Sequence, residues 1–397
     1  MAMKMKLVIF LCFLCRGVAP ASASGTYNVM DFGAKADGTT DDSQAFLAAW
    51  KEACNSSGQA KVLVPVGTYF LNPVEFRGPC PGVQDLTFQF QGTVKASTDL
   101  NKYKQTHGWV AFSHVDRLTL TGGGTFDGQG AVSWPLNNCP KQKDCTPLPT
   151  SLSFVNTNNT FVKDITSMNS KFFHVALMNC NNFKGSGITI KAPVNSPNTD
   201  GIHLEGNSGV TISSSNIGTG DDCVSIGQGN SFVTVSGINC GPGHGISVGS
   251  LGRYNTEKDV ENILVRDSTF IGTLMGVRIK TWVNSPIQTT AKNITFANLI
   301  MKNVGNPIIV DQTYCPYSNC DNSVPSRVQL KDITFKDIRG TAQYKEAITL
   351  KCSKGFPCQG LKLENVNLQS SGTQSAGSVC LNARAVYSGQ VNPTPCN

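Results

Sequence analysis

Charged residues make up only 15% of this 397-residue chain, and Lys and Arg are dispersed instead of clustered among aromatic residues. That absence excludes the usual nucleic-acid-binding surfaces. Beyond residue 23 no apolar run approaches the ~20 residues that a membrane-spanning helix needs. The same part of the chain lacks a CxxC pair and has little clustered His, so we expect no metal site.

The first 23 residues have the pattern of a secretory signal. Lys4 and Lys6 supply a positive start, Leu7–Cys15 an apolar core, and Ala21–Ala23 a small-residue cleavage site. A membrane anchor is the alternative, but this apolar run is too short to span a bilayer. We therefore expect secretion of residues 24–397, which carry 30 basic against 26 acidic residues. Such a mild positive charge does not oppose an anionic partner.

Thirteen of the 15 Cys remain after residue 23, and in a secreted chain they are expected to form disulfides. The expected pairs are Cys139–Cys145, Cys315–Cys320, Cys352–Cys358, Cys380–Cys396, Cys223–Cys240 and Cys54–Cys80. Cys180 is then left as a buried thiol. Glycosylation sequons at Asn55, Asn158 and Asn293 also fit secretion.

Helical periodicity is nearly absent except near the N-terminus. Asp41–Cys54 has helix character, with Phe46, Leu47 and Trp50 on one face. We expect this helix to cover the open end of a stacked core, as repeat folds require. Asn28–Gly33 is expected to form the first strand.

From about Phe88, short β-rich runs alternate with turns rich in Gly, Asn, Ser and Asp. Anchors of the form apolar–x–apolar recur at steps of 22 or 23 residues, which later lengthen. They begin at Ile165, Ile188, Val210, Val233, Ile263, Ile294, Ile333 and Leu361. A period of this kind is typical of a solenoid. Coils of about 22 residues with several short strands predict an all-β fold, a parallel β-helix.

Four short polar motifs stand out between residues 198 and 280. They are Asn198-Thr199-Asp200, Gly220-Asp221-Asp222, Gly243-His244-Gly245 and Arg278-Ile279-Lys280. Asp200 and Asp222 are 22 positions apart, and so are Asp222 and His244. If each coil takes about 22 residues, these side chains lie on neighbouring strands, ~4.8 Å apart. Arg278 and Lys280 are two apart, so on a strand both point to the same side.

Each motif alone is weak. An Asp-Asp pair flanked by Gly is usually a turn, and Asp200 could belong to one as well. His244 could face solvent between flexible glycines, and Arg278 with Lys280 could lie on a solvated strand face. The order and near-constant spacing of all four motifs favour a shared functional site instead.

These segments resemble those of a known family. SPNTDGIHLEG, GTGDDCVSIG, CGPGHGISVGSLG and GVRIK are similar to the motifs of polygalacturonases, the pectin-cleaving glycoside hydrolases, and most similar to the plant pollen-type exopolygalacturonases. The resemblance covers nearly the whole mature chain. It implies one catalytic domain over residues 24–397, no cofactor, and the homogalacturonan of the plant cell wall as substrate. It also implies a right-handed β-helix, in agreement with the general preference for right-handed crossovers. We expect a monomer; expression in pollen, where several relatives are allergens, is suggested only by the resemblance.

The resemblance also implies catalytic roles. Asp221 would be the general acid, while Asp200 and Asp222 would hold and deprotonate the attacking water, giving hydrolysis with inversion. His244 would hydrogen-bond to the acid and to the sugar. Spacing alone does not choose between Asp221 and Asp222 as the acid.

Four further residues are candidates for substrate binding. Arg278 and Lys280 would bind a sugar carboxylate, Arg with two hydrogen bonds and Lys as a point charge. Tyr314 matches a cleft tyrosine of the family, but it could instead support the Cys315–Cys320 loop at the rim. Asn198 could bind substrate or orient Asp200.

Three physical expectations follow from the residues themselves. Because neighbouring residues of a regular strand face opposite ways, Asp221 and Asp222 can both enter a cleft only if the backbone is irregular there. Clustering three acids should raise at least one carboxyl pKa, which would help to keep Asp221 protonated. A bell-shaped pH profile is then expected.

His174 is expected to be a packed histidine.

Other functions stay open at this point. An endo-acting polygalacturonase is the nearest alternative, because exo action requires loops that block one end of a cleft. A rhamnogalacturonan hydrolase is next, although Arg278 and Lys280 favour a homogalacturonan carboxylate. A lyase would usually need a calcium site or an Arg base, and the sequence has no dedicated acidic cluster for calcium. A noncatalytic wall-binding solenoid is disfavoured by the complete set of acids and His.

Overall fold

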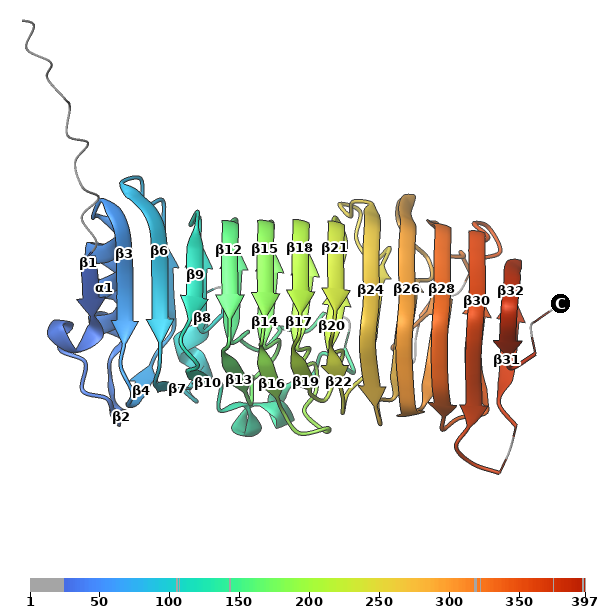
Figure 1. The fold of residues 1–397 in the computed structure, drawn as a ribbon, viewed down its shortest axis with the longest axis horizontal. Helices are drawn as coiled ribbons and strands as arrows, with labels where there is room; N and C mark the ends of the chain where they lie inside the picture. The colour runs from blue at the N-terminus through green and yellow to red at the C-terminus, as the bar shows by residue number, and fades with distance from the viewer. Residues whose placement is uncertain are drawn as a thin grey trace, which may run out of the picture.

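The protein is described by a computed structural model covering residues 25–104, 106, 108–142, 144–317, 320–321, 323–373, 375–394 and 396. The expected signal segment, residues 1–23, lies outside the described residues. Within them the chain forms an elongated column of stacked strands, with β1 at one end and β32 at the other (Figure 1). The pairings between successive coils are parallel, so the predicted stack of parallel strands is confirmed.

Two parallel sheets run along the column in the described part of the chain. One has 11 strands, and each pairs with the corresponding strand of the next coil. Its strands are β5 (Val74–Arg77), β8 (Val110–Ser113), β11 (Leu152–Val155), β14 (Val175–Met178), β17 (Ile202–Glu205), β20 (Val224–Ile226), β23 (Ile246–Leu251), β25 (Met275–Trp282), β27 (Asn306–Tyr314), β29 (Glu346–Lys351) and β31 (Gly377–Leu381).

The other sheet has 21 strands and forms the rest of the wall. Its strands are β1 (Gly25–Asn28), β2 (Asp37–Asp41), β3 (Gly58–Val64), β4 (Thr68–Leu71), β6 (Val83–Phe90), β7 (Thr93–Ala96), β9 (Leu118–Thr121), β10 (Thr125–Asp127), β12 (Asn158–Lys163), β13 (Thr166–Met168), β15 (Asn181–Ser186), β16 (Thr189–Lys191), β18 (Ser208–Ser213), β19 (Asn216–Gly218), β21 (Ser231–Ser236), β22 (Asn239–Cys240), β24 (Val260–Ile271), β26 (Thr289–Val304), β28 (Val328–Ala342), β30 (Gln359–Ser370) and β32 (Ala385–Asn392).

The helices are short and lie outside the sheets. They are α1 (Ser43–Cys54) and the 3-10 helices η1 (Val29–Phe32), η2 (Leu100–Tyr103), η3 (Gly130–Val132) and η4 (Trp134–Leu136). Helix α1 lies at the N-terminal end of the column, as expected (Figure 1). Phe46 and Trp50 are buried there, and their rings contact Tyr69 and Phe76 of the first coils.

The expected first strand, Asn28–Gly33, is wrong. Strand β1 ends at Asn28, and the chain then forms η1. The Asn28 side chain accepts a hydrogen bond from the Met30 backbone N–H at 3.0 Å, which caps this helix. The local cap therefore outweighs the strand preference of the apolar residues that follow.

Buried apolar columns hold successive coils together. Six of the predicted anchors are register partners in one such column: Val210, Val233, Ile263, Ile294, Ile333 and Leu361. Ile165 and Ile188 do not belong to it, because the partner of Val210 on the preceding coil is Phe183. The connection between β16 and β17 is longer than the equivalent connection between β13 and β14 on the preceding coil. The even spacing from Ile188 to Val210 therefore relates two buried positions that are not register partners.

The predicted disulfides are all present: Cys54–Cys80, Cys139–Cys145, Cys223–Cys240, Cys315–Cys320, Cys352–Cys358 and Cys380–Cys396. Cys180 is a buried free thiol, also as predicted. Its neighbour on the next coil is Asn207, whose Oδ1 accepts a hydrogen bond from the Cys180 backbone N–H.

Two buried asparagines form a ladder through the turns. Asn207 donates from its Nδ2 to Asn230 Oδ1 at 2.9 Å, and the Asn207 backbone N–H donates to the same oxygen. Asn230 in turn donates to the carbonyls of Leu204 and Gly227. These side chains pair backbone groups of the turn, including the buried Asn207 N–H.

We predict that Asn230→Ala lowers the free energy of unfolding by about 3 kcal/mol, because it leaves buried backbone groups unpaired. Asn239→Ala is the matched control: its Nδ2 also bonds to an asparagine one coil away, Asn216, but the pair is exposed. That change should cost less than about 1 kcal/mol. Urea unfolding of both variants measures the difference, and equal losses would contradict this role of the buried ladder.

Candidate active site

The register of the 11-stranded sheet places three of the predicted residues in one row along the column. Ile202 of β17 lies opposite Val224 of β20, which lies opposite Ile246 of β23. Asp200, Asp222 and His244 each come two residues before these partners. They therefore occupy the same position on three successive coils, as the 22-residue spacing predicted.

The backbone at Asp221 and Asp222 is irregular, as expected. Both residues lie in the bend between β19 and β20, and the Asp222 backbone N–H donates to Asp221 Oδ1 at 2.9 Å. Gly220 allows this bend to pack closely, since a Cβ there would collide with the carbonyl oxygen of Ser196. The disulfide from Cys223 to Cys240 fastens the residue after Asp222 to the next coil.

Asp222 is buried and its charge is balanced by two cations. Arg278 Nη2 donates to Asp222 Oδ1 at 3.0 Å, and Lys280 Nζ donates to Oδ2 at 2.9 Å. The Ser247 hydroxyl adds a hydrogen bond to Oδ1 at 2.9 Å. Burial opposes the charge of Asp222, but Lys280 and Arg278 outweigh it and lower the pKa of this carboxyl.

Arg278 and Lys280 thus reach the site from the same side of β25, as their spacing predicted. Both side chains are themselves nearly buried. The sequence led us to expect that they face the carboxylate of a substrate. In the described structure both cations form ion pairs with Asp222, so any substrate carboxylate would have to share them.

Asp200 has the opposite electrostatic state. Burial raises its pKa well above the usual carboxyl range, and the neighbouring charges of Asp221 and Asp222 add to the effect. The side chain of Ser225 donates a hydrogen bond to Asp200 and Lys280 lies near it, but both effects are smaller. The prediction that clustering raises at least one carboxyl pKa is confirmed, and the group concerned is Asp200.

Asp221 and His244 form the accessible part of the cluster. His244 Nδ1 lies 3.0 Å from Asp221 Oδ1, and the two side chains are 33% and 18% exposed, against 1% for Asp222. Burial alone would lower the pKa of His244, but its hydrogen bond and charge interaction with Asp221 outweigh burial and raise it. This pair can therefore hold a proton where a ligand can reach it.

Asn198 orients Asp221 instead of Asp200. Its Nδ2 donates to Asp221 Oδ2 at 3.3 Å, and its Oδ1 accepts from Asn137 Nδ2 at 3.1 Å. Asn137 belongs to the long connection between β10 and β11, residues 128–151, and is itself nearly buried. That connection therefore contacts the acid cluster through Asn137.

Tyr314, at the end of β27, lies next to the cations. Lys280 Nζ is 5.5 Å from the centre of its ring, and the edge of Trp282 packs against it at 5.4 Å. Burial raises the pKa of its hydroxyl. Tyr314 also directly precedes Cys315. Its position therefore fits both hypotheses, a tyrosine that contacts substrate in the cleft and a tyrosine that supports the Cys315–Cys320 loop.

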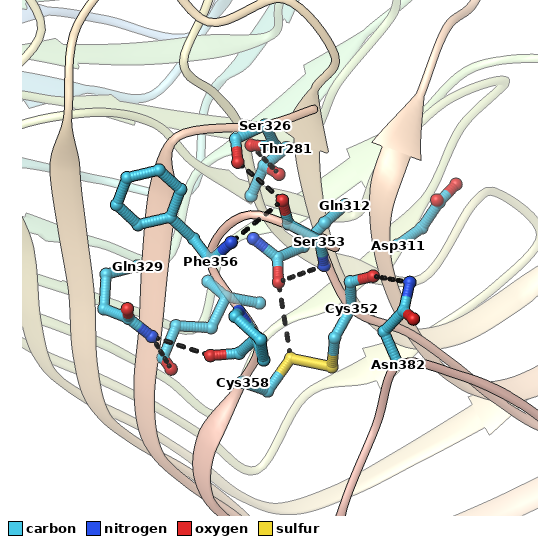
Figure 2. Close-up of a disulfide and its surroundings, with 12 residues drawn as sticks. Thr281, Asp311, Gln312, Ser326, Gln329, Cys352, Ser353, Phe356, Cys358 and Asn382 are labelled. Atoms are coloured by element: carbon cyan, nitrogen blue, oxygen red, sulfur yellow. Dashed lines mark hydrogen bonds between the residues drawn. A yellow bond between two sulfur atoms is a disulfide. The ribbon is translucent and has the colours of Figure 1, made fainter. Parts of the chain in front are cut away.

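Polar groups around the Cys352–Cys358 disulfide hold strand β27 in place through the side chain of Gln312. Figure 2 shows the buried Gln312 amide pointing toward this disulfide, with Gln312 Oε1 accepting from the Ser353 backbone N–H at 3.0 Å. The other end of the amide donates to the Val328 carbonyl at 2.7 Å. These contacts fix the strand two residues before Tyr314.

Sequence reasoning missed a second row of polar side chains. His203, Ser225 and Ser247 are register partners on β17, β20 and β23, and Arg278 continues the row on β25. The first three are spaced by 22 positions, as the acids are, and each follows a residue of the Asp200–Asp222–His244 row by three. The same period could therefore have found them. His174, in contrast, is fully buried, as expected of a packed histidine.

A metal ion is the alternative use of this cluster, since ligand atoms of Asp221, Asp222 and His244 lie within 4.8 Å of one another. The oxygens of Asp222, however, already accept from Arg278 and Lys280. A metal would have to displace or approach two buried cations, and their repulsion opposes this. The donor set therefore fits a hydrolytic carboxylate cluster better than a metal site.

Comparison with known proteins identifies the family. The model of the glycosyl hydrolases family 28 matches residues 54–389. An exopolygalacturonase of Platanus acerifolia is 47% identical over 379 residues, 95% of this chain and 99% of the relative. An exopolygalacturonase of Zea mays is 43% identical over 373 residues, 94% of this chain and 90% of the relative.

Among solved structures, the hyperthermoactive exopolygalacturonase from Thermotoga maritima matches with a TM-score of 0.72 and 19% identity over 87% of each chain. At that identity the likeness concerns the fold, which is the right-handed parallel β-helix predicted from the sequence. With a family model and relatives that span most of its length, the chain belongs to glycosyl hydrolase family 28.

Proposed function

We propose that the protein hydrolyses the α-1,4-galacturonosyl linkages of polygalacturonate and releases galacturonate from the non-reducing end. Family membership and the relatives named exopolygalacturonases support this activity. One observation carries the proposal: three carboxylates meet at one point in different electrostatic states, beside two cations that suit an anionic sugar.

The cluster suggests a division of roles. The proton held by Asp221 and His244 passes to the leaving glycosidic oxygen as its bond to the anomeric carbon breaks. A water held by Asp200 and Asp222 attacks that carbon, and Asp200 accepts the water's proton. Asp222 stays ionised next to its two cations and balances positive charge as it develops on the sugar.

Inversion is favoured by the way the oxygens of Asp222 are occupied. Oxygens of Asp221 and Asp222 lie within 4.8 Å, close to the ~5–5.5 Å that separates the acid and the nucleophile of retaining enzymes. Because Arg278 and Lys280 occupy the oxygens of Asp222, this carboxylate is a poor nucleophile, and the base role falls to Asp200. These contacts support attack by water in a single displacement.

Exo action is supported by the connection formed by residues 128–151. Through Asn137 it contacts Asn198 and Pro197 next to the acids, on the N-terminal side. A polymer would meet this connection as an obstacle along the column. The space left there is expected to admit the end of a chain more readily than its middle.

Secretion is also part of the proposal. Six disulfides are typical of proteins that fold in an oxidising compartment. The sequon residues Asn55, Asn158 and Asn293 are all exposed. Among the residues that the structure describes, no helix has the length and apolar character to cross a bilayer.

The products on trigalacturonate test the proposal directly. We predict galacturonate as the first monomer released, initially as the β-anomer, because a single displacement inverts the α-linkage. Proton NMR during the first turnovers measures the anomer, and chromatography measures product length. An initial α-anomer would contradict inversion, mixed oligomers from longer substrates would indicate endo action, and ultraviolet-absorbing products would indicate a lyase.

Variants of the cluster should separate chemistry from binding. Asp221→Asn removes the proton donor, so we predict that kcat falls about 10²–10⁴-fold while KM changes little. Lys280→Ala should mainly raise KM; because Lys280 also neutralises Asp222, kcat falls as well, but less than in Asp221→Asn. Steady-state kinetics on polygalacturonate measures both, and an unchanged kcat in Asp221→Asn would remove this residue from the acid role.

The pH dependence of kcat/KM should be bell-shaped. Activity requires ionised Asp200, whose raised pKa places the acidic limb above the ~3.9 of an ordinary Asp. Activity also requires the proton of the Asp221–His244 pair, and the raised pKa of His244 places the alkaline limb above ~6.5. Initial rates from acid to alkaline pH measure both limbs, and a flat profile would contradict the assignment.

A further inference from the structure

Two amide side chains link the connection formed by residues 128–151 to the proposed general acid. Asn137 Nδ2 donates to Asn198 Oδ1 at 3.1 Å, and Asn198 Nδ2 donates to Asp221 Oδ2 at 3.3 Å. Asn137 is only 8% exposed, so its amide is held away from solvent. Buried amides of this kind keep one orientation when all their hydrogen-bonding groups have partners.

The direction of both hydrogen bonds is fixed by the backbone. The Cys139 backbone N–H can only donate, and it donates to Asn137 Oδ1 at 3.0 Å. The other end of the Asn137 amide therefore faces Asn198, and it also donates to the Pro197 carbonyl at 3.3 Å. Asn198 must then present its oxygen to Asn137 and its nitrogen to Asp221. A reversed Asn198 amide would place two N–H donors against each other.

Backbone contacts hold the connection where it carries Asn137. The Gly130 backbone N–H donates to the Asn169 carbonyl at 2.7 Å. The Trp134 indole N–H donates to the Ser170 carbonyl at 2.9 Å. This part of the connection thus follows the turn between β13 and β14, and Asn137 reaches the next coil, between β16 and β17. The connection can therefore act as a fixed support for the Asn198 amide.

The two oxygens of Asp221 have different surroundings. Oδ1 accepts from the Asp222 backbone N–H at 2.9 Å and lies 3.0 Å from His244 Nδ1. Within the described part of the chain, Asn198 is the one hydrogen-bond partner of Oδ2. Because a carboxyl oxygen has two lone pairs, both places on Oδ1 are used and one on Oδ2 is open. Oδ2 is therefore the oxygen from which a proton can pass to a sugar.

We propose that Asn137 is a positioning residue for the general acid: by fixing the Asn198 amide, it turns Asp221 so that Oδ2 delivers the proton to the leaving oxygen. This inference rests on the proposed hydrolytic function. In that step the O–H bond at Oδ2 breaks and the proton joins the glycosidic oxygen, as the bond from that oxygen to the anomeric carbon breaks. Water forms the new bond to this carbon and loses its proton to Asp200.

A matched pair of variants tests the role of Asn137. Asn137→Ala leaves the Asn198 amide free to turn, so we expect kcat on trigalacturonate to fall about tenfold and KM to change less than about twofold. Asn138→Ala removes an amide of the same size from the next residue, which is exposed, and should leave kcat at the wild-type value. An unchanged kcat in Asn137→Ala, or a change in KM alone, would overturn the proposal.

A double-variant cycle with Asp221→Asn separates positioning from a merely structural role. Without the acid there is no proton donor to orient, so Asn137→Ala should cause no further loss of kcat in the Asp221→Asn background. If Asn137 only stabilises the connection, its loss should appear in both backgrounds, and the two effects would multiply. Thermal unfolding of each full-length variant accompanies the kinetics.

Asn198→Gly is a second arm that does not depend on the folding of Asn137→Ala. Asn198 has a positive φ of 52°, which glycine adopts freely, so this change removes the amide without backbone strain. It should lower kcat at least as much as Asn137→Ala, and the two changes together should lower it no further. An Asn198→Gly variant with wild-type kcat would also overturn the proposal.

These outcomes are separate from those that test the function. Variants whose losses multiply would still hydrolyse trigalacturonate, so the proposed function would stand while the role of Asn137 fell. Absence of hydrolysis by the unsubstituted protein would overturn both.

Discussion

The parallel register between successive coils is the constraint on which the site depends. Between β17 and β23 each coil takes 22 residues, so side chains that are far apart in the sequence become neighbours across strands. After β23 the coils lengthen, and Arg278 lies opposite Ser247 at a distance of 31 positions. Strand pairing thus brings the cations next to the acids. The extra residues of the longer coils form loops at the ends of the strands (Figure 1).

Within this frame, charge distinguishes carboxylates that are otherwise alike. Asp222 has two cations and a hydroxyl around it and stays ionised in a buried position, whereas Asp200 resists ionisation because it is buried and because the charges of Asp221 and Asp222 add to the effect of burial. Asp221 is closer to solvent, and its carboxylate contacts the imidazole of His244. A cluster of three Asp can therefore supply an acid, a base and a fixed charge, because burial and partners differ at each position.

Much of this arrangement could be predicted from the sequence, and the failures have identifiable causes. The 22-residue period located Asp200, Asp222 and His244 because these coils contain no insertions. The same count failed at Ile188, where a longer connection before β17 shifts the step. The first strand was misplaced because the Asn28 cap, a single side-chain hydrogen bond, decides the local conformation.

Other contacts of the site could not be predicted from the 22-residue period. That Arg278 and Lys280 neutralise Asp222, and that Asn198 holds Asp221, depends on side-chain reach across coils that spacing does not specify. The contact of Asn137 with Asn198 joins positions 61 apart through an irregular connection. Such contacts arise from tertiary packing and leave no repeat in the sequence.

The central claim is that coil register assembles one hydrolytic centre from groups in opposite charge states. A crystal structure of Asp221→Asn with a bound galacturonate oligomer tests it most directly. The account predicts the scissile oxygen next to residue 221, a water between Asp200 and Asp222 on the opposite face of the sugar, and a sugar carboxylate near Arg278 and Lys280. An oligomer bound elsewhere on the column, or a bond presented to Asp222 without a water between them, would contradict it.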